Sequence, residues 1–138
     1  MGLRMRLTRQ TNLAVRMLMY CAANDGHLSQ VAKIAASYGT SQLYLAQISK
    51  PLVEAGLLAT VRGRNGGIRL RQPASQITLA SVVRVMEAMT SHIDGAIDDL
   101  AERALQSAFD AFLGALSGVT IADLIARTPG FKNLLDVA

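Results

Sequence analysis

Apolar residues recur every three or four positions in the first part of the chain, which is the spacing of amphipathic helices. Residues 8–23 form one such segment, which Thr8 or Thr11 can cap and which an Asn-Asp-Gly turn ends. Residues 29–38 form a second segment, which ends at Gly39 because glycine adopts the left-handed conformation most easily. The pattern therefore predicts two helices joined by a short loop.

A third helix is predicted to begin at a cap on Thr40 or Ser41 and to run to about Ala55. Pro51 lies inside it, and because proline removes one helical hydrogen bond, we expect a bend or a loosening near residues 47–51. The second and third helices with their short connection form a helix-turn-helix, which alone is a weak signal. The core-facing residues of the third helix are Leu45, Ile48 and Leu52.

A basic hairpin is predicted after the third helix. Residues 57–61 have the pattern of a strand, and the segment RGRNGG at 62–67 contains the Asn-Gly pair that is typical of hairpin turns. Residues 68–70 alternate apolar and polar side chains, as a half-exposed return strand does, and Pro73 ends the hairpin. The order helix, turn, helix, hairpin predicts a winged helix-turn-helix.

Further helices are predicted in the second half of the chain, over residues 81–89, 98–116 and 121–127. The predicted fold class is therefore mainly α with a small β-hairpin. We expect a winged helix-turn-helix domain over residues 1–78 and a helical dimerisation region over residues 79–138, with a loop at about 90–99. Thr120 can cap the last helix.

The longest of these C-terminal helices carries an apolar stripe that a small domain can hardly cover alone. Its members are Leu105, Ala108, Phe109, Phe112 and Leu116. Pairing with the same helix of a second chain would bury the stripe, which predicts a homodimer. The alternative is that the helix packs back on the winged helix.

The charge of the chain is divided unevenly, although the formal net charge is only +4. Residues 1–75 contain ten Lys or Arg against two acidic residues, whereas residues 76–138 contain four against eight. Such a division indicates that the first half meets a polyanion, either nucleic acid or a lipid surface. No apolar run approaches the roughly 18 residues that cross a bilayer, so we expect a cytoplasmic protein with no membrane partner.

The hydrophobic pattern and the charge together suit double-stranded DNA. On the third helix, Gln can bond adenine and Lys can reach guanine or phosphate, while a serine at the helix start suits a phosphate. On the hairpin, Arg suits a narrow minor groove. The predicted DNA-binding residues are Ser41, Gln42, Tyr44, Gln47, Lys50, Arg62, Arg64 and Asn65. The alternative is that these side chains form an ordinary solvated surface.

Catalysis and metal binding have little support in the sequence. His27 and His92 lie apart without evident partners, and RGRNGG is not followed by the Lys-Ser/Thr of a phosphate-binding loop. His92 with Asp94, Asp98 and Asp99 could bind a metal only weakly. The single Cys21 allows no disulfide and no zinc site by itself, and we expect it to be a small buried residue. The protein is therefore not expected to be an enzyme.

The chain resembles a known family at the opening RLTRQTNLAVRMLMYCA, at the helix-turn-helix of residues 28–58 and at VRGRNGGIRLRQPASQITLASVVRVME. These motifs, which cover most of residues 4–90, are similar to the Rrf-two-type (IscR/NsrR/RirA) family of winged helix-turn-helix transcription regulators. Within it the resemblance is nearest to the RirA iron-regulator branch. The resemblance implies a homodimer that binds a pseudo-palindromic operator, usually as a repressor. It also places the third helix in the major groove and the wing, with Arg62, in the minor groove.

Many members of this family hold an iron–sulfur cluster with three cysteines between the first two C-terminal helices. Here that stretch, residues 89–103, contains no cysteine and is shorter than the cluster-bearing pattern by about ten residues as judged by resemblance. Because a cluster needs thiolates, the family's cofactor is not expected in this chain. Either the chain is a cluster-free regulator, or a cysteine-bearing loop is absent from the sequence.

The function predicted from all these features is a sequence-specific DNA-binding transcriptional regulator. We expect a homodimeric repressor in iron or in redox and nitrosative-stress regulation. The alternative is a winged-helix module that binds proteins and not DNA. The two differ in their response to salt, because binding through several phosphates weakens steeply as the salt concentration rises.

Overall fold

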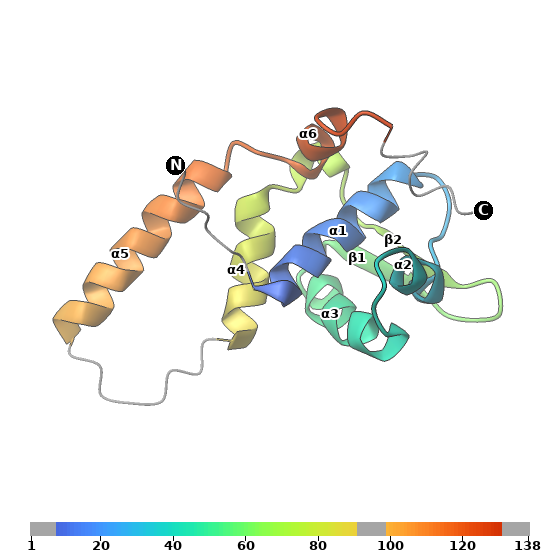
Figure 1. Ribbon diagram of the computed structural model, residues 1–138, viewed down its shortest axis with the longest axis horizontal. Coiled ribbons are helices and arrows are strands. Elements are labelled where there is room, and N and C mark those ends of the chain that lie inside the picture. The colour runs from blue at the N-terminus through green and yellow to red at the C-terminus, as the bar shows by residue number, and fades with distance from the viewer. Residues whose placement is uncertain (1–7, 91–98, 131–138) are drawn as a thin grey trace.

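The computed structural model describes residues 8–90 and 99–130 (Figure 1). In these residues six α-helices, one short 3-10 helix and a two-stranded antiparallel hairpin follow one another along the chain. The bounds are α1 Arg9–Ala23, α2 Val31–Ser37, α3 Gln42–Glu54, β1 Leu58–Val61, β2 Gly67–Leu70, η1 Ala74–Gln76, α4 Leu79–Thr90, α5 Asp99–Leu116 and α6 Ile121–Ala126. The predicted class, mainly α with a small β-hairpin, is confirmed.

The caps of three helices are those that the sequence predicts. The Thr8 and Ser41 side chains accept hydrogen bonds from the backbone N–H groups at the starts of α1 and α3. At the start of α6, Thr120 and Asp123 form a reciprocal capping box, with hydrogen bonds of 3.1 and 2.9 Å. These backbone hydrogens have no partner inside the helix, so the caps fix where each helix begins.

Two predictions about the helix-turn-helix are wrong in detail. The second helix begins at Val31 and not at residue 29, because the backbone of Ser29 pairs with Ile68 on the hairpin. The loosening predicted for the third helix near residues 47–51 is absent, because the helix continues through Pro51 to Glu54, whereas a bend there stays a prediction. The residue after the proline, Leu52, is fully buried, and this packing holds the last turn although one hydrogen bond is missing.

The main core surrounds α1, which contacts α3, α4, α6 and β2. Met17 and Leu18 on α1 are fully buried and belong to the same cluster as buried residues of the helix-turn-helix, the hairpin and the C-terminal helices. Each such side chain contributes about 1.5–3 kcal/mol by leaving water. The division into two domains at residue 78 stays a prediction.

The C-terminal segment returns to this core after a second, smaller cluster. Ala80 and Val83 on α4 pack against Leu113 on α5, and Phe109, Phe112 and Leu116 lie partly buried beside them. The chain then re-enters the main core at α6, where Ile121 is fully buried. Its N–H donates to the Ile77 carbonyl oxygen at 2.9 Å. Among the described residues, the packing of α5 on α4 therefore involves the C-terminal half of the helix.

Candidate nucleic-acid interface

Helix α3 buries one side and exposes the other, as its sequence predicts. Leu45, Ile48 and Leu52 are buried in the main core. The opposite face is exposed along the whole helix and carries Gln42, Leu43, Ala46, Gln47 and Lys50. The structure thus brings three predicted DNA-binding residues, Gln42, Gln47 and Lys50, onto one solvent-facing surface.

Two other predicted residues, Ser41 and Tyr44, have structural partners at the start of α3. The Ser41 hydroxyl accepts the Tyr44 N–H at 3.1 Å, so it caps the helix. The Tyr44 ring is half-buried, and the Arg9 guanidinium lies over it at 5.4 Å from the ring centroid. This cation–π contact joins the first turn of α1 to the first turn of α3. Whether Ser41 and Tyr44 also touch DNA stays a prediction.

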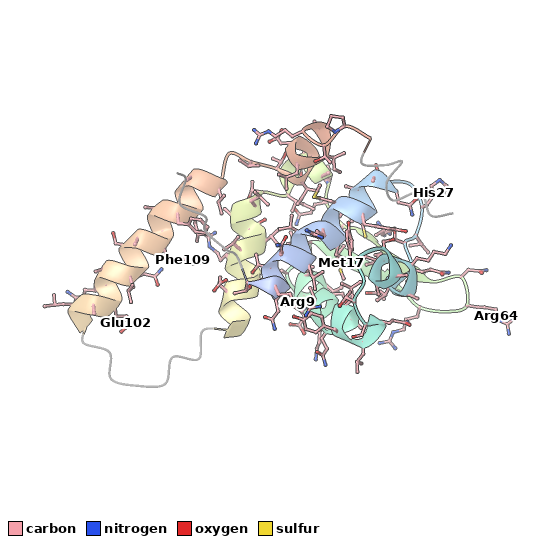
Figure 2. All side chains as sticks on the ribbon, in the orientation of Figure 1. Arg9, Met17, His27, Arg64, Glu102 and Phe109 are labelled. Carbon is pink, nitrogen blue, oxygen red and sulfur yellow. The ribbon has the colours of Figure 1, made fainter. Side chains whose placement is uncertain are left out.

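Arg9 is a basic residue beside this surface that is not among the predicted DNA-binding residues. Its side chain is exposed and is held near the start of α3 by Tyr44 (Figure 2). The contact joins residues far apart in the chain, so no local pattern predicts it. The one signal in the sequence is that Arg9 belongs to the ten basic residues of residues 1–75.

A second pair of the same kind fixes α2 against α1. The Arg16 guanidinium lies 5.6 Å from the Tyr38 ring centroid, and the Tyr38 hydroxyl donates to the Arg16 carbonyl oxygen at 3.1 Å. Burial raises the pKa of Tyr38 to about 12, although the Arg16 charge acts in the opposite direction. The hydroxyl therefore keeps the proton that it donates, and the turn between α2 and α3 is held in place.

The hairpin, or wing, is formed by β1, β2 and the connecting residues 62–66. Leu58 pairs with Leu70 and Val61 with Gly67, and the side chains of Arg62, Arg64 and Asn65 are exposed. Figure 2 shows Arg64 pointing away from the body of the molecule at the tip of the wing. The three predicted wing residues are thus presented together to the outside.

The glycines of RGRNGG are required by the hairpin itself. Gly63 has a φ of +115°, and a Cβ at Gly66 would overlap the Val61 carbonyl oxygen. A Cβ at Gly67 would lie 2.5 Å from the carbonyl oxygen of Ser29. That closeness comes from two hydrogen bonds of 2.8 Å between the backbones of Ser29 and Ile68. The wing is therefore fastened to the loop between α1 and α2.

The wing is also strongly basic. Arg62 and Arg64 lie at its tip, and Arg69 and Arg71 lie exposed on and after its return strand. Within residues 8–90 and 99–130 no acidic side chain forms an ion pair with any of these four. A wing with four uncompensated charges, packed beside α3 through β1, is suited to a polyanion.

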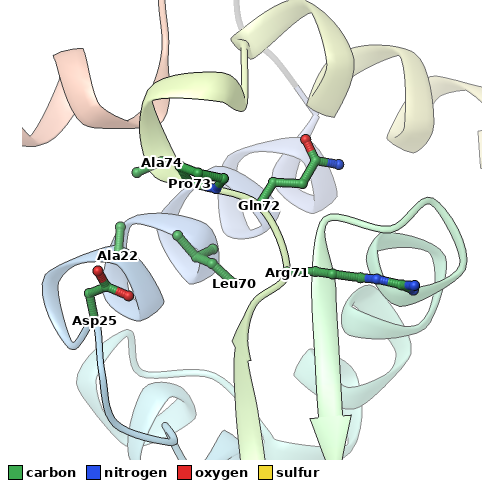
Figure 3. A pocket seen from close by; sticks show the side chains of 7 residues that line it. All are labelled: Ala22, Asp25, Leu70, Arg71, Gln72, Pro73 and Ala74. Carbon is green, nitrogen blue, oxygen red and sulfur yellow. The ribbon is translucent and has the colours of Figure 1, made fainter.

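A small pocket of about 260 Å³ lies at the base of the wing, away from the exposed face of α3. Its walls come from the end of α1, the end of β2 and the start of η1, with Leu70 and Pro73 among the apolar lining (Figure 3). Asp25 and Arg71 also line it, and Figure 3 shows the Arg71 side chain extending across the neighbouring strand, away from the other lining side chains.

The only cysteine of the sequence is part of the core and not of this surface. Cys21 is 3% exposed, and burial raises the pKa of its thiol to about 12, partly offset by a hydrogen bond from Ser29. Among the residues with described positions, no group of three or more His, Cys, Asp or Glu could hold a metal ion. His92, Asp94 and Asp98 of the weak metal-site hypothesis lie outside them. No helix in the described part of the chain has the length and apolarity to cross a membrane.

A helix-turn-helix with a basic hairpin beside its second helix defines a winged helix-turn-helix regulator. The chain belongs to the Rrf2 family, described as iron-dependent transcriptional regulators, whose family model matches residues 7–127. Members of this family regulate transcription by binding DNA and are not enzymes. The predicted family is thereby confirmed, whereas the nearness to the RirA branch stays a prediction.

The chain is also similar to individual proteins, in sequence and in structure. The chain is 51% identical to protein aau3 of Rhizobium meliloti (strain 1021) over 141 residues, covering 95% of this chain and 92% of that protein. Because 141 exceeds the 138 residues of this chain, the alignment must place gaps in it. Among solved structures, CymR (YrzC), the global cysteine regulator of B. subtilis, is similar with a TM-score of 0.72 and 27% identity, covering 91% of this chain and 99% of that chain.

A more distant structure supports the fold alone. IscR of T. potens is 22% identical with a TM-score of 0.67, and the match covers 89% of this chain and 88% of that chain. The winged helix-turn-helix followed by C-terminal helices is therefore shared by regulators that differ widely in sequence.

Proposed function

We propose that the protein is a homodimeric repressor that binds a specific operator in iron or in redox and nitrosative-stress regulation. Support for DNA binding comes from the family, and support for an iron-linked role comes from its description as iron-dependent. The observation that carries the proposal is the uncompensated basic wing fastened beside the exposed polar face of α3.

In this proposal α3 enters the major groove and the wing follows the neighbouring minor groove. Gln42 and Gln47 face base edges, where an amide bonds adenine bidentately, and Lys50 reaches guanine or phosphate. Arg62, Arg64 and Asn65 lie in or along the minor groove, where the potential is most negative. Ser41, Tyr44 and Arg9 are at the edge of this surface, close to the sugar-phosphate backbone.

The proposed dimer forms through α5. The N-terminal half of this helix projects from the body, and its Leu100 and Leu105 are 72% and 62% exposed. Figure 2 shows Glu102 on this half of α5 and Arg64 on the wing at opposite ends of the long axis. A second copy of α5 would cover the leucines and leave both wings free. Of the predicted stripe, Phe109, Phe112 and Leu116 already pack partly beside Ala80 and Val83 of α4, so the exposed leucines of the N-terminal half are the part of α5 left for a partner.

The residues present do not fit a thiolate-bound cluster. The sequence contains one cysteine, and that thiol is buried in the core with a raised pKa. A cluster of the family type requires several thiolates at an accessible loop. We therefore assign no role in DNA binding to such a cluster in this chain.

Selection of bound fragments from a random duplex pool tests the DNA proposal. We expect enrichment of a pseudo-palindromic sequence with two equivalent half-sites. Enrichment of no sequence at low salt would contradict DNA recognition and would favour the protein-binding alternative.

Light scattering tests the dimer. We expect a mass near twice the 14.7 kDa of the chain, and Leu105→Asp should shift the protein toward the monomer because it places a charge in the interface. A persistent monomer of the unaltered protein at micromolar concentration would contradict the role given to α5.

A further inference from the structure

Leu43 is an apolar side chain in the first turn of α3, and around the helix axis it lies at the centre of the exposed face. It is 73% exposed, more than any other large hydrophobic residue of the described part of the chain. At 100° per residue it projects between Gln42 and Gln47, on the same side as Ala46 and Lys50. A leucine in this position leaves apolar surface in water without a gain for the fold.

Within residues 8–90 and 99–130, Leu43 has no role in the packing of the core. The side chain belongs to neither of the two hydrophobic clusters, although Tyr44 and Leu45 beside it both pack on the main core. The other strongly exposed leucines, Leu100 and Leu105, lie on α5. Leu43 instead lies on the exposed face of α3, which enters the major groove in the proposed function.

The edges of the base pairs in the major groove carry one apolar group, the C5 methyl of thymine. We propose that Leu43 contacts this methyl group and selects thymine at one position of each half-site. The inference rests on the proposed function and adds Leu43 to the residues that determine which operator sequence is bound. An A·T pair presents the adenine acceptor and donor beside the thymine methyl, so Gln47, one turn along the helix, is placed to bond an adenine nearby. The Ala46 methyl widens the apolar contact.

Replacing thymine by uracil tests the inference, since uracil differs at this edge only by lacking the methyl group. Each thymine of the selected operator is exchanged for uracil in both half-sites, and affinity is measured by gel shift. Because burial of one methyl contributes about 0.8 kcal/mol, we expect a loss of about fourfold per half-site at one position and little change elsewhere.

The variant Leu43→Ala identifies the residue responsible. We expect it to bind the thymine operator more weakly and to bind the thymine and uracil operators equally well. Since the Leu43 side chain is exposed, the melting temperature of the Leu43→Ala variant should match that of the unaltered protein. Lys50→Ala is the matched control: it weakens binding to both operators while preserving the preference for thymine.

Three results would overturn the inference. One is equal binding of thymine and uracil operators at every position by the unaltered protein. Another is an unchanged preference for thymine in Leu43→Ala. The third is a change of mass in light scattering of Leu43→Ala, which would place the residue in a protein contact. In the first two cases specific operator binding persists and the proposed function stands, whereas a protein that binds no duplex refutes the proposed function itself.

Discussion

Cys21, Arg9 and Arg62 illustrate how surroundings decide what a residue type can do. Cys21 lies among apolar side chains and is a core residue, because the low polarity around it disfavours the thiolate. Arg9 is exposed, but Tyr44 limits where its charge can be. Arg62 is exposed on the wing with no ion pair in the described residues, so its charge is available to a phosphate or to the floor of a groove.

The raised pKa of Cys21 makes stability depend on pH in the alkaline range. The pKa of the thiol is about 12 in the folded protein and 9.0 without the effect of burial, so the contribution of Cys21 to stability is present below pH 9 and is lost as the pH rises toward 12. Urea unfolding at pH 8 and pH 10.5 measures this. The free energy of unfolding should fall by about 2 kcal/mol more in the unaltered protein than in Cys21→Ala. An equal fall in both proteins would contradict the raised pKa.

The side chain of Arg62, which directly follows β1 in the wing, is expected to strengthen operator binding. Removing it as Arg62→Ala should weaken binding fivefold or more, because a groove contact of arginine contributes about 1–3 kcal/mol. Arg84→Ala serves as the control, since Arg84 is an exposed arginine on α4, away from the wing. If Arg62→Ala binds the operator as tightly as the unaltered protein in a gel-shift titration, the role given to the wing tip is wrong.

At the scale of elements, the sequence predicts what is local and misses what is not. Helical spacing, caps and the Asn-Gly turn give the helices and the hairpin within one or two residues. The start of α2 differs because Ser29 pairs with Ile68, which lies far along the chain, and no pattern within 29–38 contains that partner. The uninterrupted α3 depends on burial of Leu52, which offsets the local effect of Pro51.

The candidate site follows the same rule. Gln42, Gln47, Lys50 and the wing residues are found from the sequence because they lie opposite a core stripe or on a turn. The contact of Arg9 with Tyr44 is formed between two helices and could not be predicted. The sequence places Leu43 on the outer face of α3, but it does not show whether another element covers that side chain. Only the structure shows that Leu43 is exposed.

The attachment of the wing to the body predicts an effect at Gly67. A methyl group at this position meets the Ser29 carbonyl oxygen, so Gly67→Ala should separate the backbones of Ser29 and Ile68, lower the melting temperature by several degrees and weaken operator binding. Gly114→Ala on α5 is the control, because a Cβ there meets nothing within 4 Å and alanine favours a helix by roughly 0.5–1 kcal/mol. Equal melting temperatures for the two variants would contradict the attachment.

For the whole molecule, the arrangement separates two kinds of surface. The basic wing and the exposed face of α3 belong to the N-terminal part, with ten basic residues against two acidic ones in residues 1–75. The projecting half of α5 belongs to a part with the opposite charge balance. A dimer joined through α5 would present two positive surfaces to one DNA duplex, as a half-site arrangement requires.

The most direct test of this account is the affinity of the dimer for its selected operator as the salt concentration rises. If α3 and the wing make six to ten phosphate contacts per dimer, affinity should fall by about 10³- to 10⁵-fold between 50 and 200 mM salt. Arg62→Ala should reduce the slope. Affinity that does not change with salt, or failure to bind the operator at 50 mM, would contradict the account.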